Sequence, residues 1–165
     1  MKKLWMILVP VLLLGCAAEP VFEKVEDVYG DALPAVAQVQ VLMPETASVM
    51  ATAGDGSGQI YFCDGYTLTV QTLAGGDMDR SIRSLTGYGR DGLTVMETLR
   101  DGIPCFTCAW TSAGEHGDQV GRLVLLDDGV WHYAVTVMAD AGRAGELTEE
   151  WDQILSSVTL QRTDP

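Results

Sequence analysis

Three Asp-Gly dipeptides, each lying between two β-prone segments, constrain the fold of this chain more than any other feature. They are Asp64-Gly65, Asp101-Gly102 and Asp128-Gly129. Asp-Gly accepts the positive φ angles of the tight turns that join antiparallel strands. The segments that flank these turns are rich in Val, Thr, Tyr, Phe and Leu, and they span residues 59–63, 66–73, 93–100, 103–110, 121–127 and 130–138. The sequence therefore predicts an antiparallel sheet built from hairpins.

Two amphipathic segments predict helices that pack on this sheet. The first covers Met78, Ile82 and Leu85, with Asp77 or Asp79 as N-cap and Gly87 as the C-terminal glycine. For the second, we expect Thr148 to be the N-cap. Its apolar stripe consists of Leu147, Trp151, Ile154, Leu155 and Val158. The predicted fold class is therefore α+β.

The remaining segments complete the expected order of elements. Residues 36–43 predict a first strand, and residues 158–160 predict a short last strand after the second helix. Residues 45–58 are rich in Gly, Ala and Thr and predict a mobile loop. Upstream of the first strand, residues 21–30 carry Phe22, Val25 and Tyr29 at helical spacing.

This order of elements resembles the PsbP-like α/β/α sandwich. The resemblance covers roughly residues 35–162, with RLVLLDDGVWHYAVTVMAD leading into the last helix and WDQILSSVTL closing onto the last strand. Photosystem extrinsic proteins, a Ran-binding import factor and many bacterial lipoproteins use this fold. The resemblance implies a mostly non-catalytic binding or assembly domain, and it carries over no site residue.

The first twenty residues have the parts of an export signal, namely Lys2 and Lys3, an apolar run, and small residues around Cys16. The run is about eleven residues long, whereas a helix that spans a bilayer needs about twenty. Residues 13–16, LLGC, resemble the lipobox of bacterial lipoproteins, whose Cys is acylated. We therefore expect a signal peptide at 1–15, an acylated N-terminus and tether at 16–20, and one globular α+β domain at 21–165. An ordinary secretory signal that ends near a Cys is the alternative.

Lipid on Cys16 would hold the domain at the cell membrane, on the extracytoplasmic side, because two acyl chains are enough for stable anchoring. The net charge is −13, and no basic cluster occurs in the chain. This charge argues against a nucleic-acid partner and against a domain lying flat on anionic lipid. It favours partners that are cationic, neutral or metal-bearing.

Besides Cys16 the chain has three cysteines, Cys63, Cys105 and Cys108. In a strand, residues three apart point to opposite faces and lie about 10 Å apart, beyond the roughly 7 Å limit for a disulfide. Cys105 and Cys108 are therefore not expected to bond each other. A disulfide between Cys63 and either of them is compatible with an oxidising compartment. The alternative is that Cys63 and Cys108 are small apolar core residues.

Glu97 is the residue of the predicted sheet whose expected surroundings are the least favourable for its side chain. A two-residue turn at Asp101-Gly102 places it opposite Phe106, on an apolar strand face. A buried carboxylate there would have a raised pKa and could be a functional acid. The two alternatives are that the register slips or that Glu97 reaches the edge of the sheet.

The loop 114–118 gathers Glu115, His116 and Asp118, which are residue types that bind metals. No second cluster at ligand spacing accompanies them, so we expect Glu115 or Asp118 to pair with Arg122 instead. His132 alternates with aromatic residues and predicts a sheet histidine, and serines are scarce near either histidine. The sequence thus predicts no catalytic residue, no cofactor and no metal.

The leading hypothesis is a lipid-anchored, non-catalytic lipoprotein that binds or stabilises another cell-envelope component. An extracytoplasmic binder of a small ligand or cation, using loop 45–58 and the acidic turns, is the first alternative. The second is an enzyme that depends on Glu97 or on Cys105 and Cys108.

Overall fold

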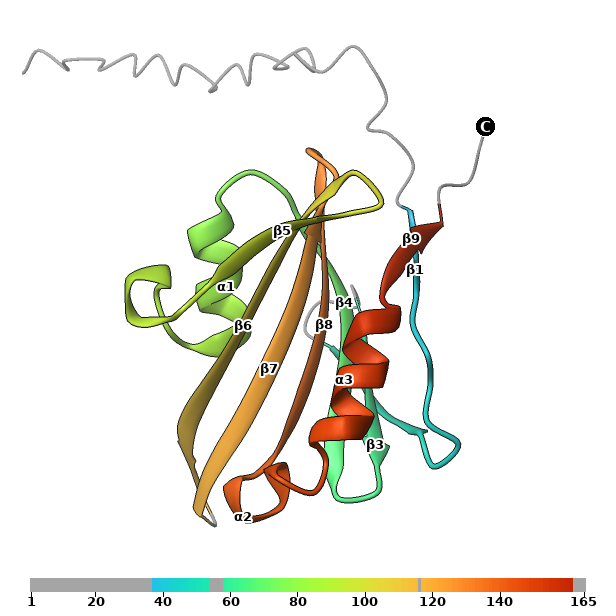
Figure 1. Cartoon of the computed structure of the whole chain (residues 1–165), viewed down its shortest axis with the longest axis vertical. Helices are drawn as coiled ribbons and strands as arrows, with labels where there is room; N and C mark the ends of the chain where they lie inside the picture. The colour runs from blue at the N-terminus through green and yellow to red at the C-terminus, as the bar shows by residue number, and fades with distance from the viewer. Residues whose placement is uncertain (1–36, 54–57, 116, 162–165) are drawn as a thin grey trace, which may run out of the picture. The chain divides into compact units, whose positions relative to one another are not determined.

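The computed structural model describes residues 37–53, 58–115 and 117–161. The predicted signal peptide, Cys16, the tether, the segment 21–30 and His116 lie outside these ranges. Within the ranges, nine strands and four helices follow one another in this order (Figure 1): β1 Gln38–Gln40, β2 Ser48–Ala53, β3 Gly58–Cys63, β4 Tyr66–Ala74, α1 Met78–Thr86, η1 Arg90–Gly92, β5 Met96–Arg100, β6 Ile103–Gly114, β7 Gly117–Asp127, β8 Trp131–Asp140, α2 Ala141–Ala144, α3 Thr148–Ser157 and β9 Thr159–Gln161.

Seven of these strands form one antiparallel sheet in the order β2-β3-β4-β8-β7-β6-β5. The predicted α+β class is confirmed. β1 and β9 pair with each other in a separate two-stranded sheet, with Val39 opposite Leu160. The predicted first strand is thus shorter than expected, and it pairs with the strand after the last helix.

Loop 45–58 was the main error in the predicted elements, because it contains β2. The segment Ser48–Ala53 pairs with β3 along its length, from Ser48 opposite Phe62 to Ala53 opposite Gly58. Its Ala and Met residues have little intrinsic preference for strands. Hydrogen bonding to a neighbouring strand therefore decides its conformation.

The predicted turns are correct at two of three sites. Cys63 faces Tyr66 and Arg100 faces Ile103, so Asp64-Gly65 and Asp101-Gly102 are two-residue turns. The third turn is shifted by one residue. The N–H of Asp128 donates to the carbonyl of Trp131, and Gly129 takes a φ of 90°. The reason is that Oδ1 of Asp128 accepts from the N–H groups of Val130 and Trp131, which fixes Asp128 before the turn.

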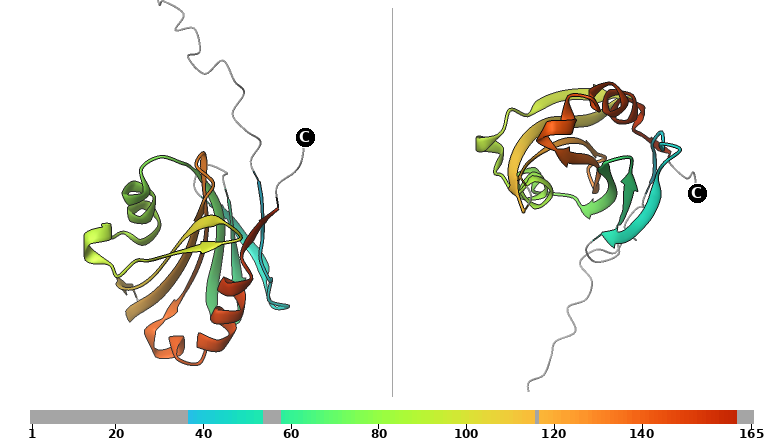
Figure 2. Two further views of the ribbon diagram at one scale, coloured as in Figure 1. Left: turned by 45° about the horizontal axis from the view of Figure 1, so that its top comes forward. Right: turned by 90° about the horizontal axis from the view of Figure 1, so that it is seen from below.

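The sheet has a helix on each face, and Figure 2 shows it as a curved ribbon between them. Alternate residues of β7 point to opposite faces. Val124 and Leu126 join the core beneath α3, whose Trp151 and Ile154 are almost completely buried. Leu123 and Leu125 join the second core, together with side chains of α1. This arrangement is the α/β/α sandwich expected from the sequence.

The two helices begin differently. Asp77 caps α1 by accepting from the N–H of Arg80 at 3.1 Å, and Gly87 ends it with a φ of 80°. Thr148, in contrast, does not cap α3, because its hydroxyl donates to the carbonyl of Ala144 at 3.1 Å. Leu147, just before α3, is already helical, with φ −90° and ψ −6°. The chain thus enters α3 from the preceding helical turn and needs no side-chain cap.

Candidate functional site

A groove of about 440 Å³ lies between α3 and the end of the sheet formed by β5, β6 and β7. In register, Met96 faces Thr107, Thr107 faces Val124, and Ala109 faces Arg122, so these side chains share one face. Asp152, Leu155 and Ser156 form the wall on α3. Figure 1 shows α3 over the centre of the sheet, with β5 and β6 to one side of it. We call this hollow the α3 groove.

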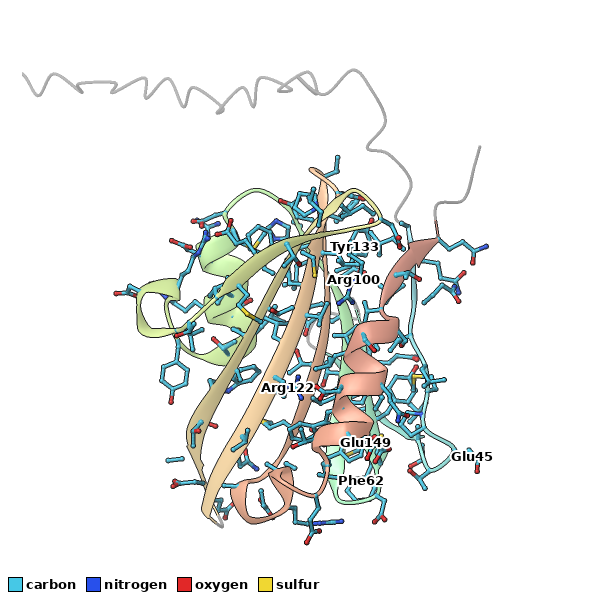
Figure 3. All side chains as sticks on the ribbon, in the orientation of Figure 1. Glu45, Phe62, Arg100, Arg122, Tyr133 and Glu149 are labelled. Carbon is cyan, nitrogen blue, oxygen red and sulfur yellow. The ribbon has the colours of Figure 1, made fainter. Side chains whose placement is uncertain are left out.

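Arg100 fixes one end of the α3 groove. Its Nη1 donates to the carbonyl of Leu155 at 2.7 Å and to the carbonyl of Val158 at 3.1 Å. Carbonyls in the last turn of a helix have no partner within the helix and carry partial negative charge. Arg100 therefore satisfies them and ties the C-terminal end of α3 to the edge strand β5 (Figure 3).

Arg122 lies in the middle of the α3 groove, where its Nη2 is 2.6 Å from Oδ1 of Asp152. The expected partner, Glu115 or Asp118, was wrong. Four residues along a strand span about 13 Å, which keeps Asp118 away from Arg122, whereas the face that Arg122 shares with Ala109 points toward α3. Figure 3 shows Arg122 beside this helix.

Glu97 lies opposite Phe106, as predicted, but its side chain is 54% exposed. β5 is the last strand of the sheet, so the carboxylate reaches solvent at the edge. There it forms an ion pair with Arg90, whose guanidinium lies 5.7 Å from the centre of the Phe106 ring. The structure thus adopts the sheet-edge alternative, in which the Glu97 carboxylate is half exposed and paired with Arg90.

Sequence reasoning missed a serine beside His132. Oγ of Ser81 on α1 lies 2.7 Å from Nδ1 of His132 on β8, and Nε2 of His132 lies 3.8 Å from Oδ1 of Asp127. The residue types are those of a hydrolytic triad, but Ser81 is 6% exposed and His132 is 0% exposed. A substrate therefore has no access to the hydroxyl. No local pattern could have predicted the contact, because 51 positions separate the two residues.

All three cysteines are buried, free thiols, so the structure forms neither disulfide that the sequence allowed. The register gives the reason. Cys63 faces Tyr66 on β4. When the register is followed from β6 across β7 and β8, Cys105 aligns with Thr72 on β4. Thr72 lies six positions, or about 20 Å, further along β4 than Tyr66. Cys108 belongs to the core on the opposite face of the sheet. Burial raises the pKa of both Cys63 and Cys108.

Within the described ranges, no three His, Cys, Asp or Glu side chains gather closely enough to hold a metal ion. Glu115 and Asp118 are exposed near the β6–β7 turn, and His116 is outside these ranges. In the same part of the chain, no helix is long and apolar enough to cross a membrane.

The sequence matches no protein-family model and none of the curated proteins. Solved structures do match, at 9–12% identity. Cyanobacterial PsbP (CyanoP) from Synechocystis sp. PCC 6803 has a TM-score of 0.53 at 10% identity, and the match covers 77% of this chain and 95% of that one. The Ran-binding protein Mog1p of Saccharomyces cerevisiae has a TM-score of 0.50 at 12% identity, with coverages of 74% and 89%.

LpqN of Mycobacterium tuberculosis, described as involved in cell envelope biogenesis, has a TM-score of 0.50 at 10% identity, with coverages of 81% and 87%. The chain spans only 45% of the length of a similar Bacteroides thetaiotaomicron protein. At such low identities the likeness concerns the fold alone. The fold is therefore PsbP-like, as the order of elements predicted.

Proposed function

We propose that this protein is a lipid-anchored extracytoplasmic binding domain, which holds another cell-envelope component in the α3 groove and performs no chemistry. The groove is the observation that carries this proposal. Its floor is partly apolar, and its arginines bond to α3, so they maintain the shape of the groove. A hollow that combines apolar surface with preformed polar groups is typical of binding sites.

The proposed anchor rests on the sequence LLGC directly after an apolar run. Twenty residues, 17–36, separate Cys16 from the first described residue, Ala37. LpqN, which shares this fold, is involved in cell envelope biogenesis, and this likeness supports a search for partners in the envelope.

Anchoring is tested by Cys16→Ser in the full chain. Acylation needs the thiol, so we expect lipid labelling and membrane retention to be lost, whereas Ala17→Ser at the neighbouring position keeps both. Membranes are washed at high salt before the fractions are blotted. Retention of the Cys16→Ser chain after this wash would refute the lipoprotein proposal.

The binding role is tested by filling the α3 groove. Ala109 is exposed on β6 and lines the groove, and Ala113 is exposed on the same face of the same strand but does not line it. We expect Ala109→Arg to fail to complement a deletion strain and Ala113→Arg to complement it. Circular dichroism checks that both chains fold. Equal complementation by two folded chains would show that the groove is not the binding site.

A further inference from the structure

We infer that the partner is an extended peptide segment of another protein, which adds to β5 as an eighth strand beside the α3 groove and directs a carboxylate toward Arg100 on that strand. The inference rests on the proposed binding function and specifies its partner chemistry. Four features of β5 and its surroundings support it.

The first feature is the set of backbone groups that β5 leaves at the sheet edge. Within the described residues β5 bonds to β6 alone. Leu99 faces Pro104, which has no N–H, so this pair is one whose backbone groups do not bond each other. The N–H and C=O of Leu99 therefore point away from β6, and by alternation those of Glu97 do as well. An added strand can therefore bond to four backbone groups of β5, the N–H and C=O of Glu97 and those of Leu99.

The second feature is the contrast between the two edges of the sheet. At the other edge, β2 shifts register between Val49 and Ala51, which marks a bulge at Met50. Bulges disrupt the ladder and are a common protection of sheet edges against added strands. β5 keeps a regular register with β6 over all five of its residues. Of the two edge strands, β5 is therefore the one whose regular backbone can pair with a further strand.

The third feature is the side chains that β5 presents. Met96 is 63% exposed and Leu99 is 73% exposed, one on each face of the strand. Charged side chains at an open sheet edge normally prevent another strand from pairing with it. The single charged residue in the interior of β5, Glu97, is neutralised by Arg90. An incoming strand therefore meets apolar surface on both faces and no unpaired charge at its centre.

The fourth feature is charge. Two arginines and one carboxylate line the α3 groove, in a chain whose net charge is −13. Arg100 uses only Nη1 for the two carbonyls of α3, and its Nε and Nη2 groups are further donors. Alternate side chains of an added strand point to the groove side, so one carboxylate there can pair with the free donors of Arg100, whereas Arg122 is already paired with Asp152. The negative field of the whole domain disfavours a long acidic tract.

The test selects random octapeptides on phage with the purified full chain, and synthetic copies of the winners are then measured by calorimetry. We expect the selected peptides to show the side-chain alternation of a β-strand and to contain one Asp or Glu. Leu99→Pro removes an outward N–H without removing a bond to β6, and Leu99→Ala keeps that N–H. We expect Leu99→Pro to weaken binding by about tenfold or more and Leu99→Ala to weaken it by less than about threefold. Replacing the carboxylate by its amide should weaken binding to the parent chain but not to the folded Arg100→Gln chain.

Amide hydrogen exchange supplies a readout that does not depend on variants. Bound peptide should slow exchange at Glu97 and Leu99 and leave β2 unchanged. Selection of no peptide, equal binding to folded Leu99→Pro, or protection of β2 instead of β5 would each overturn the inference. If one of these occurs while Ala109→Arg still fails in cells, the groove binds a partner by another mode, and only this inference is lost.

Discussion

The hydroxyl of Ser81 lies 2.7 Å from Nδ1 of His132 in a fully buried contact that joins α1 to the sheet. The other ring nitrogen, Nε2, is buried without a hydrogen-bond partner among the described residues. His132 therefore depends on Ser81 for the one hydrogen bond of its ring. The residue types resemble those of a catalytic centre, but the burial makes this pair part of the core.

Removing the Ser81 hydroxyl should destabilise the fold. Ser81→Ala leaves Nδ1 of a buried ring unpaired, which costs about 1–3 kcal/mol. Urea denaturation followed by tryptophan fluorescence measures the free energy of unfolding. Ser84→Ala is the matched control, because Ser84 is exposed on the same helix and its hydroxyl donates to the carbonyl of Ser81. Equal, small losses in both variants would contradict the role assigned to the Ser81–His132 contact.

The features that the sequence predicted correctly are local ones. The cap at Asp77, one of the two expected caps, the glycine at Gly87 and the turn at Asp64-Gly65 each depend on a few neighbouring residues, and all three form. Two local expectations were wrong, the cap at Thr148 and the position of the third turn; the other errors concern pairing across the chain. β2 has a weak strand preference of its own, and Arg122 reaches Asp152, thirty positions away. Residue spacing carries little information on such contacts.

Truncating Trp151 should cost more than any surface change on α3. Trp151 is 1% exposed and packs edge-on against Tyr66, with ring centres 6.0 Å apart. Trp151→Ala should lower the free energy of unfolding by about 3–5 kcal/mol. Gln153→Ala, on the exposed side of the same helix, should change it by less than about 0.5 kcal/mol. A melting temperature unaffected by Trp151→Ala would show that α3 does not dock on the sheet in solution.

Gly121 on β7 should tolerate no side chain. It faces Trp110 on β6, and the Trp110 ring occupies the space that a Cβ would need. Gly121→Ala therefore forces the ring to move, and such overpacking typically costs about 1–3 kcal/mol. Gly142→Ala in α2 is the control, because a Cβ there meets nothing within 4 Å. Comparable melting temperatures for the two variants would contradict the packing of Trp110 on Gly121.

Only part of the candidate site could be predicted from the sequence. The register of Glu97 opposite Phe106 follows from the Asp101-Gly102 turn, and this register also sets which groups of β5 face outward. The α3 groove itself depends on where α3 crosses the sheet. That position is fixed by contacts such as Arg100 with Leu155, which join residues 55 positions apart. Such contacts leave no periodic pattern along the chain.

The three buried thiols give the last prediction, which also decides the disulfide question. A thiol reacts as its thiolate. Burial raises the pKa of Cys63 and Cys108, and Cys105 is only 1% exposed. We therefore expect the folded chain at pH 8 to react with a thiol reagent at none of these three sites.

In denaturant without reductant, all three thiols should react, because the register keeps Cys63 far from Cys105 and on the opposite face from Cys108. Peptide mapping of the labelled chain assigns each site and separates Cys16 from the other three. A count of one reactive thiol among the three after denaturation would mean that a disulfide had formed, and the strand order β2-β3-β4-β8-β7-β6-β5 would then be wrong. Rapid labelling of the folded chain would instead mean that the core around these cysteines opens readily.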